Sequence, residues 1–127
     1  MSGSARILVI EDEPSLRDHL VRMLEFEGFQ VDTAADGREG ISKARELIPD
    51  VVICDLLMPG INGFGACRVL RDDPVTSKIP TIVVSALSSP SDREKIDELG
   101  VQAYLSKPFR NQELIDALQR CLGGSSG

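Results

Sequence analysis

Short apolar segments alternate along the chain with longer stretches in which apolar residues recur at helical spacing. Residues 6–10, 51–54 and 81–84 are almost continuously apolar and rich in Val and Ile, which is typical of strands buried on both faces of a parallel sheet. Residues 30–34 and 101–105 have a weaker pattern of the same kind. The chain is therefore expected to contain five strands.

A helix is predicted after each of these strands. Pro14 suits the first turn of the first helix, in which Leu16, Leu20 and Leu24 recur at helical spacing until Gly28 ends the segment. Further helices are predicted over 37–47, around 64–70, over 92–99 and from 111 onward. The same strand-then-helix unit is thus repeated five times.

This alternation predicts an α/β fold, because neighbouring parallel strands need crossover connections, which helices supply and which are nearly always right-handed. We expect one domain with a doubly wound five-stranded parallel sheet of the flavodoxin-like (βα)5 type, in strand order 2-1-3-4-5. The domain is expected to span residues 5–122, with 1–4 and 123–127 as flexible termini. In such folds the functional site lies beyond the carboxyl ends of the strands.

Polar side chains follow four of the predicted strands. Glu11 and Asp12 follow the first strand, Asp55 the third, Ser85 the fourth and Lys107 the fifth. Three carboxylates in one crevice repel one another unless a cation relieves them, and oxygen ligands without His or Cys select Mg²⁺, or Mn²⁺ in its place, over zinc. A metal, a lysine and an attacking carboxylate together suit phosphoryl transfer.

These residues resemble the response-regulator receiver domains of two-component signalling, the group to which chemotaxis regulators belong, from about Arg6 to Leu122. The resemblance rests on four motifs in order: ILVIEDEP at 7–14, DLLMPG at 55–60 followed by Gly63, VSA at 84–86 and KPF at 107–109. Each motif alone is weak evidence, whereas four at these separations are specific.

The resemblance implies a role for each group of the site. Asp55 would accept the phosphoryl group, Asp12 would bind Mg²⁺ directly, and Glu11 would act mainly through a metal-bound water. The backbone carbonyl of Leu57 would be a further ligand, and Lys107 would pair with the aspartyl phosphate.

The resemblance also implies a conformational switch. Ser85 would turn its hydroxyl toward the phosphoryl group, and Tyr104 occupies the place of an aromatic residue that swings inward in response. The Lys107-Pro108 bond would be cis, a form that proline makes accessible. Two positions depart from the commoner family residues, since Glu11 replaces Asp and Ser85 replaces Thr, and both changes preserve the chemistry.

By the same resemblance, the phosphodonor would be a histidine kinase or another phosphohistidine carrier. Phosphorylation would change the surface formed by the fourth helix, fifth strand and fifth helix, and so alter affinity for an output partner that the sequence does not identify. The chain would be a signalling domain and not an enzyme acting on a separate substrate, although it would assist its own phosphorylation and dephosphorylation. A homodimer is one further arrangement compatible with this family.

Composition and charge limit the classes of partner that the chain is expected to bind. A net charge of −6 argues against direct contact with nucleic acid, which needs a concentrated basic surface. No apolar run is long enough for membrane insertion, and the first residues lack the pattern of a signal peptide, so we expect a cytoplasmic protein. Cys54, Cys67 and Cys121 form no recognisable metal motif and are interpreted as structural thiols.

Two alternatives remain open at this point. The fold alone also suits a module that binds a flavin or nucleotide, although Glu11 to Glu13 stand where such a module needs a phosphate-binding loop. A pseudo-receiver or engineered scaffold would keep the fold as an interaction module without signalling. Individual residues also have ordinary explanations: Asp55 as a loop cap, Tyr104 as a packing residue and His19 as a surface residue.

Overall fold

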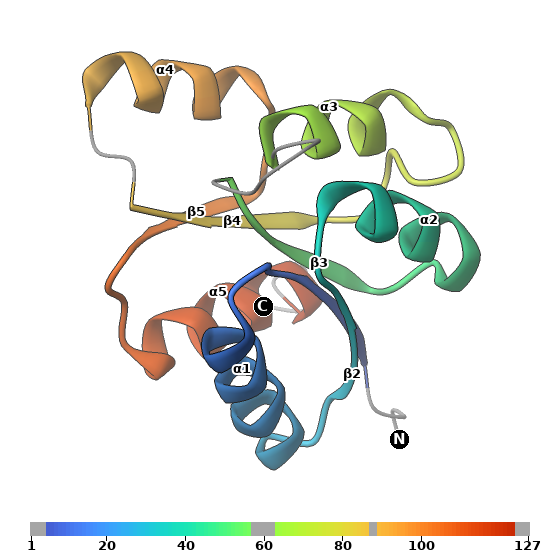
Figure 1. Ribbon diagram of the computed structural model, residues 1–127, viewed down its shortest axis with the longest axis vertical. Coiled ribbons are helices and arrows are strands. Elements are labelled where there is room, and N and C mark those ends of the chain that lie inside the picture. Colours follow the sequence, from blue (N-terminus) through green and yellow to red (C-terminus); the bar gives the residue numbers. More distant parts are fainter. Residues whose placement is uncertain (1–4, 57–62, 87–88, 124–127) are drawn as a thin grey trace.

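Five strands and five helices alternate along the chain, as the hydrophobic pattern predicts (Figure 1). The computed structural model describes residues 5–56, 63–86 and 89–123. The elements are, in chain order, β1 (Arg6–Ile10), α1 (Pro14–Phe26), β2 (Gln30–Ala34), α2 (Gly37–Leu47), β3 (Val51–Asp55), α3 (Gly63–Asp72), β4 (Thr81–Ser85), α4 (Pro90–Glu98), β5 (Ala103–Ser106) and α5 (Asn111–Gly123).

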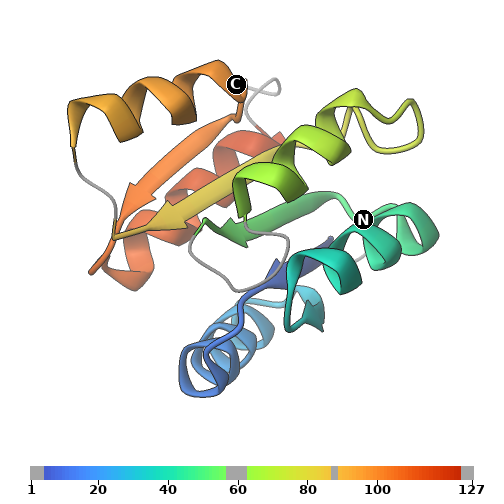
Figure 2. The ribbon, with the colours of Figure 1, turned by 45° about the horizontal axis from the view of Figure 1, so that its top comes forward.

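The sheet is entirely parallel, with strand order β2-β1-β3-β4-β5. Helices α1 and α5 cover one face, and α2, α3 and α4 cover the other (Figures 1 and 2). The predicted fold class and strand order are both confirmed. The carboxyl ends of β1, β3 and β4 consequently lie at one edge of the sheet. The polar residues Glu11, Asp12, Asp55 and Ser85 lie at these strand ends.

Two apolar clusters hold the layers together, one on each face of the sheet. Along β1, Ile7 and Val9 face α1 and α5, whereas Leu8 and Ile10 face α2 and its neighbours. All four side chains are fully buried. The continuous apolar pattern of the central strands therefore reflects burial on both faces.

Two elements start two residues away from the predicted position. Helix α4 begins at Pro90, two positions before the predicted start, because the Ser89 hydroxyl accepts a hydrogen bond from the Asp92 N–H at 3.1 Å and so caps the helix. Strand β5 begins at Ala103 and not at 101. Val101 and Gln102 belong to the connection from α4. The backbone N–H of Gln102 donates to the Thr81 carbonyl at 3.0 Å, so this contact with β4 comes just before β5 begins.

Helix α5 runs to Gly123, one residue past the expected end of the domain. Across the described ranges of the chain, no helix has the length and apolar character that crossing a bilayer requires.

Candidate metal site

Three acidic side chains converge at the carboxyl ends of β1 and β3. Glu11 and Asp12 directly follow β1, and Asp55 is the last residue of β3. One carboxylate oxygen from each lies within 4.8 Å of the other two. Glu11 and Asp55 are only 1% and 4% exposed, and Asp12 is half-buried, so the cluster opens to solvent on the Asp12 side. Neighbouring parallel strands that end together are the cause of this convergence.

Lys107 supplies the positive charge opposite the acids. Its Nζ donates to Asp55 Oδ2 at 2.9 Å and lies 3.5 Å from Glu11 Oε1. The backbone N–H of Lys107 donates to the carbonyl of Ser85 at 2.8 Å, which fixes the start of the β5–α5 connection against β4. The Lys107-Pro108 bond is cis, as predicted.

Glu11 sits in the least favourable position for a negative charge. Its pKa is raised overall from 4.5 to about 7. Burial is the largest cause, and the nearby charge of Asp55 also raises the pKa, whereas the Glu13 N–H, which donates to Glu11 Oε2 at 3.1 Å, and the charge of Lys107 lower it. Burial also lowers the pKa of Lys107, but the hydrogen bond and charge of Asp55 outweigh this and raise it overall. A cation bound at the cluster would therefore favour the ionised form of Glu11.

Of the other predicted site residues, Ser85 lies on the strand next to Asp55, whereas Tyr104 lies further from the acidic cluster. Ser85 is the fully buried last residue of β4, and Asp55 pairs in register with the residue before it, Val84. Tyr104 lies further back on β5, half-buried beneath α4, where the guanidinium carbon of Arg93 is 5.1 Å from its ring centroid. Leu57 lies outside the described residues. Glu13 is not part of the cluster and caps α1, accepting from the Leu16 N–H at 2.7 Å.

Two further residues position the cluster, and sequence reasoning linked neither of them to it. A side chain on Gly63 would place Cβ 2.2 Å from the Asp55 carbonyl oxygen and 2.4 Å from Leu56 Cα, so α3 packs directly on the backbone of the acidic strand end. The guanidinium of Arg17 donates to the Glu11 carbonyl at 3.0 Å and fixes the β1–α1 turn. The sequence indicates that Gly63 is a turn or helix-start residue, and α3 does begin there, but no sequence signal connected Gly63 or Arg17 with the acidic cluster.

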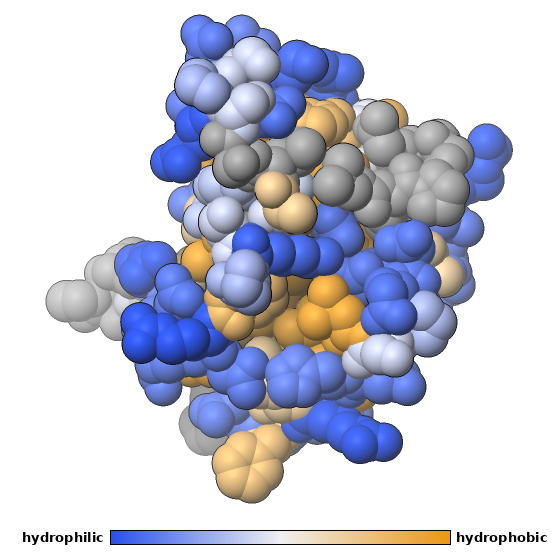
Figure 3. Space-filling view, turned by 60° about the vertical axis from the view of Figure 1, so that its left-hand side comes forward, coloured by the Kyte–Doolittle hydropathy of each residue, from blue (hydrophilic) through white to orange (hydrophobic). Residues whose placement is uncertain are grey.

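An apolar cavity of about 430 Å³ opens beside Lys107. It lies between the start of α1 and the β5–α5 connection, and its lining consists of Leu16, His19, Ala86, Lys107, Pro108, Phe109 and Asn111. Figure 3 brings this side of the molecule forward and shows an apolar hollow rimmed by hydrophilic side chains. The acidic cluster thus has a nonpolar surface next to its lysine.

Comparison with known proteins agrees with this geometry. A family model described as the response regulator receiver domain matches residues 7–119. Protein PilH of Pseudomonas aeruginosa is 40% identical over 120 residues, covering 94% of this chain and 99% of PilH. Two other curated relatives, a transcriptional regulatory protein and a DNA-binding response regulator, are matched at 41% identity, and the chain spans about half of their length.

Solved structures of receiver domains have the same fold. The chemotaxis protein CheY4 of Vibrio cholerae superposes with a TM-score of 0.88 at 32% identity, covering 94% of this chain and all of that chain. The receiver domain of the sensor histidine kinase PA1611 from Pseudomonas aeruginosa, solved with a magnesium ion coordinated in its active site cleft, gives a TM-score of 0.88 at 31% identity, covering 95% and 99% of the two chains.

None of these matches supports a flavin- or nucleotide-binding module. Receiver domains are signalling domains and not enzymes in the ordinary sense. The matched family, the identities over nearly the whole chain and the acidic cluster agree, and the chain belongs to the response regulator receiver domain family of two-component signalling proteins.

Proposed function

We propose that this receiver domain is switched by phosphorylation of Asp55, with Mg²⁺, or Mn²⁺ in its place, held by Glu11, Asp12 and Asp55. The observation that carries the proposal is the convergence of these three carboxylates within 4.8 Å, with the Lys107 ammonium 2.9 Å from Asp55. All the side-chain ligands offered are carboxylate oxygens, which is the donor set that a hard divalent cation prefers. The residues present therefore fit the metal that the family uses.

In this proposal Asp55 is the nucleophile. One of its carboxylate oxygens forms a bond to phosphorus while the bond between phosphorus and the donor atom breaks, and the donor leaves with that electron pair. Lys107, already hydrogen-bonded to Asp55, pairs with the negative charge of the new aspartyl phosphate. When held by Glu11, Asp12 and Asp55, a divalent cation would supply positive charge that offsets the charge of the phosphoryl oxygens.

Two finer assignments extend this mechanism. Glu11 would act on the cation mainly through a water molecule, and the backbone carbonyl of Leu57, which lies outside the described residues, would be a further ligand. Water that later attacks the aspartyl phosphate reverses the modification, so the same residues assist both phosphorylation and dephosphorylation.

The output of the switch is a changed surface on α4, β5 and α5. The Ser85 hydroxyl moves toward the phosphoryl group and Tyr104 follows it inward. Helix α4 suits such a role because, between Pro90 and Glu98, Ile96 is its one buried side chain, and the Arg93 contact with Tyr104 adds to its attachment. An element held by few contacts changes position at low energetic cost. A partner protein, not yet identified, reads the new surface.

A magnesium titration tests the ligand set. We expect Mg²⁺ to perturb the ¹H–¹⁵N signals of Glu11, Asp12, Asp55 and Lys107, and Asp12→Asn to weaken binding by roughly tenfold or more, since a ligand charge is lost. Glu13→Gln is the matched control, because Glu13 is the next residue along but caps α1. Perturbation elsewhere, or equal weakening by both substitutions, would show that the ligands are misassigned.

We further propose that the phosphodonor is a histidine kinase or another phosphohistidine carrier, which contacts the apolar cavity beside Lys107. Phe109→Ala removes an aromatic wall of this cavity and is expected to slow transfer from a purified phosphohistidine-carrying kinase by about tenfold or more, while labelling by acetyl phosphate is kept. Phe26→Ala is the control, since Phe26 is 88% exposed at the far end of α1. Equal effects of Phe109→Ala on both donors would contradict the proposed contact.

A further inference from the structure

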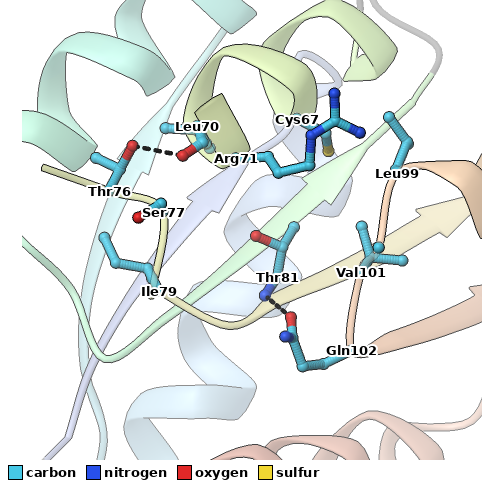
Figure 4. Close-up of a pocket in the computed structure, with 11 residues that line it drawn as sticks. Cys67, Leu70, Arg71, Thr76, Ser77, Ile79, Thr81, Leu99, Val101 and Gln102 are labelled. Carbon is cyan, nitrogen blue, oxygen red and sulfur yellow. Dashed lines mark hydrogen bonds between the residues drawn. The ribbon is translucent and has the colours of Figure 1, made fainter. Parts of the chain in front are cut away.

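A second cavity lies at the other edge of the sheet, where β4 and β5 begin. It lies between α3, the turn before β4 and the connection from α4 to β5, and Figure 4 shows residues of its lining, among them Cys67, Arg71, Thr81 and Gln102. Its volume is about 40 Å³. A space of this size admits a molecule of a few atoms, such as water or hydrogen peroxide, and excludes larger ligands. We call it the amino-end cavity.

Thr81 contributes a hydroxyl group to the wall of the amino-end cavity. Thr81 is 7% exposed, and its backbone N–H donates to Gln102 Oε1 at 2.8 Å. In Figure 4 the hydroxyl points away from Gln102 toward the part of the cavity where Leu70 and Arg71 lie. The hydroxyl of Thr76, which also lines the cavity, donates to the Leu70 carbonyl at 2.7 Å. A small polar guest in the cavity would form a hydrogen bond with the Thr81 hydroxyl.

Cys67 lines this cavity, and its thiol is in contact with a second thiol, that of Cys54. It lies on α3, is 4% exposed, and its thiol shares a hydrogen bond with Cys54 on β3. That hydrogen bond lowers the pKa of Cys67, although burial raises it. Both cysteines belong to the same apolar cluster, and Cys54 Sγ is 3.4 Å from the Asp55 carbonyl. The third thiol, Cys121, packs on the opposite face of the sheet.

We propose that Cys67 and Cys54 are a thiol pair that hydrogen peroxide, admitted through the amino-end cavity, oxidises to a disulfide. The Cys67 sulfur attacks one peroxide oxygen, the O–O bond breaks, and the products are Cys67 sulfenic acid and water. The Cys54 sulfur then attacks the Cys67 sulfur, the S–O bond breaks, and a second water leaves with the Cys54 proton. Two thiols are oxidised by two electrons, and one peroxide is reduced to two waters.

The disulfide would connect β3 to α3 next to the acidic cluster. Cys54 immediately precedes Asp55, and α3 begins at Gly63, whose N–H donates to the Leu56 carbonyl at 3.1 Å. A covalent link at this point restrains the strand end that carries Asp55 and is expected to slow its phosphorylation. The thiol chemistry itself does not depend on phosphorylation, so it is tested separately.

The test is peptide mapping of the wild-type protein after exposure to hydrogen peroxide and alkylation of the remaining thiols. The expected product is an intramolecular disulfide between Cys54 and Cys67 that dithiothreitol reverses, with Cys121 still alkylated. The proposal is overturned if Cys54 and Cys67 are alkylated as in the untreated protein, or if Cys121 is oxidised before them.

Two variants test formation of the disulfide and entry of peroxide separately. Cys54→Ala removes the second thiol, and Cys67 sulfenic acid should then persist and be trapped by dimedone. Thr81→Val keeps the shape of the side chain but removes the hydroxyl, and oxidation of Cys67 should slow by roughly five- to tenfold, the factor expected for one lost hydrogen bond. An unchanged rate in Thr81→Val, with cooperative thermal unfolding retained, would show that peroxide does not enter through the amino-end cavity.

Discussion

Replacing Asp55 with Asn is expected to abolish phosphorylation of the protein by acetyl phosphate in the presence of Mg²⁺. The amide has no anionic oxygen to attack phosphorus, so the covalent step is lost and not merely slowed. The fold should survive, because Asn has nearly the same shape and Lys107 keeps its 3.5 Å contact with Glu11. The measurement is the phosphorylated fraction by intact-protein mass spectrometry.

Asp116→Asn is the control for this experiment. Asp116 lies on the exposed side of α5, where its carboxylate accepts a hydrogen bond from the Gln112 amide at 2.8 Å. Its substitution should leave labelling unchanged. Stoichiometric labelling of Asp55→Asn would mean that another residue is the acceptor, and the proposed chemistry would then be wrong.

The metal-free protein is expected to lose stability as the pH rises from about 4.5 to about 7. In the folded state burial raises the pKa of Glu11 to about 7, so the folded protein holds this proton more tightly than the unfolded chain does. Stability is therefore greatest below the unfolded pKa and falls as Glu11 is forced to ionise. The size of the fall follows from the shift and is about 3 kcal/mol in the free energy of unfolding.

Urea denaturation in the presence of EDTA at a series of pH values measures this effect. Glu11→Gln should remove most of the dependence and stabilise the metal-free protein above pH 7, because a neutral amide replaces a buried charge. Saturating Mg²⁺ should likewise restore the stability of the wild-type protein at high pH, since the cation binds the ionised acids. A free energy of unfolding that is flat or rises over this range would contradict the burial argument.

Local signals were sufficient to predict most of the elements. Helix α2 has the predicted bounds because its start is encoded nearby: the Asp36 side chain accepts a hydrogen bond from the Glu39 N–H at 2.8 Å. Strand β5 was predicted two residues too early because its start depends on contacts between Gln102 and Thr81, which are distant in sequence. A pattern of apolar residues contains no information about such contacts.

The same distinction applies to the site. The proximity of Glu11, Asp12, Asp55 and Lys107 follows from the topology of a parallel sheet, so residue type and strand ends were enough to anticipate it. Their chemical roles stay predictions. The packing of Gly63 on the Asp55 backbone depends on how α3 approaches β3, and no local pattern specifies that approach.

The contact between Cys54 and Cys67 could not be predicted from the sequence, although their burial agrees with the interpretation as structural thiols. These two cysteines are thirteen positions apart and match no short motif that would indicate a pair. The crossover from β3 to α3 returns the chain over the sheet and places the two side chains in contact. Their proximity is a consequence of the fold.

Localising the phosphoryl group in the wild-type protein tests the central claim most directly. The protein is incubated with acetyl phosphate and either Mg²⁺ or EDTA, digested, and the modified residue is identified by tandem mass spectrometry. We expect a single acid-labile phosphoryl group on Asp55 with Mg²⁺ and none with EDTA. A phosphoryl group on any other residue, or equal labelling of Asp55 without the metal, would contradict the proposal that the acidic cluster is a metal-dependent phosphoryl acceptor.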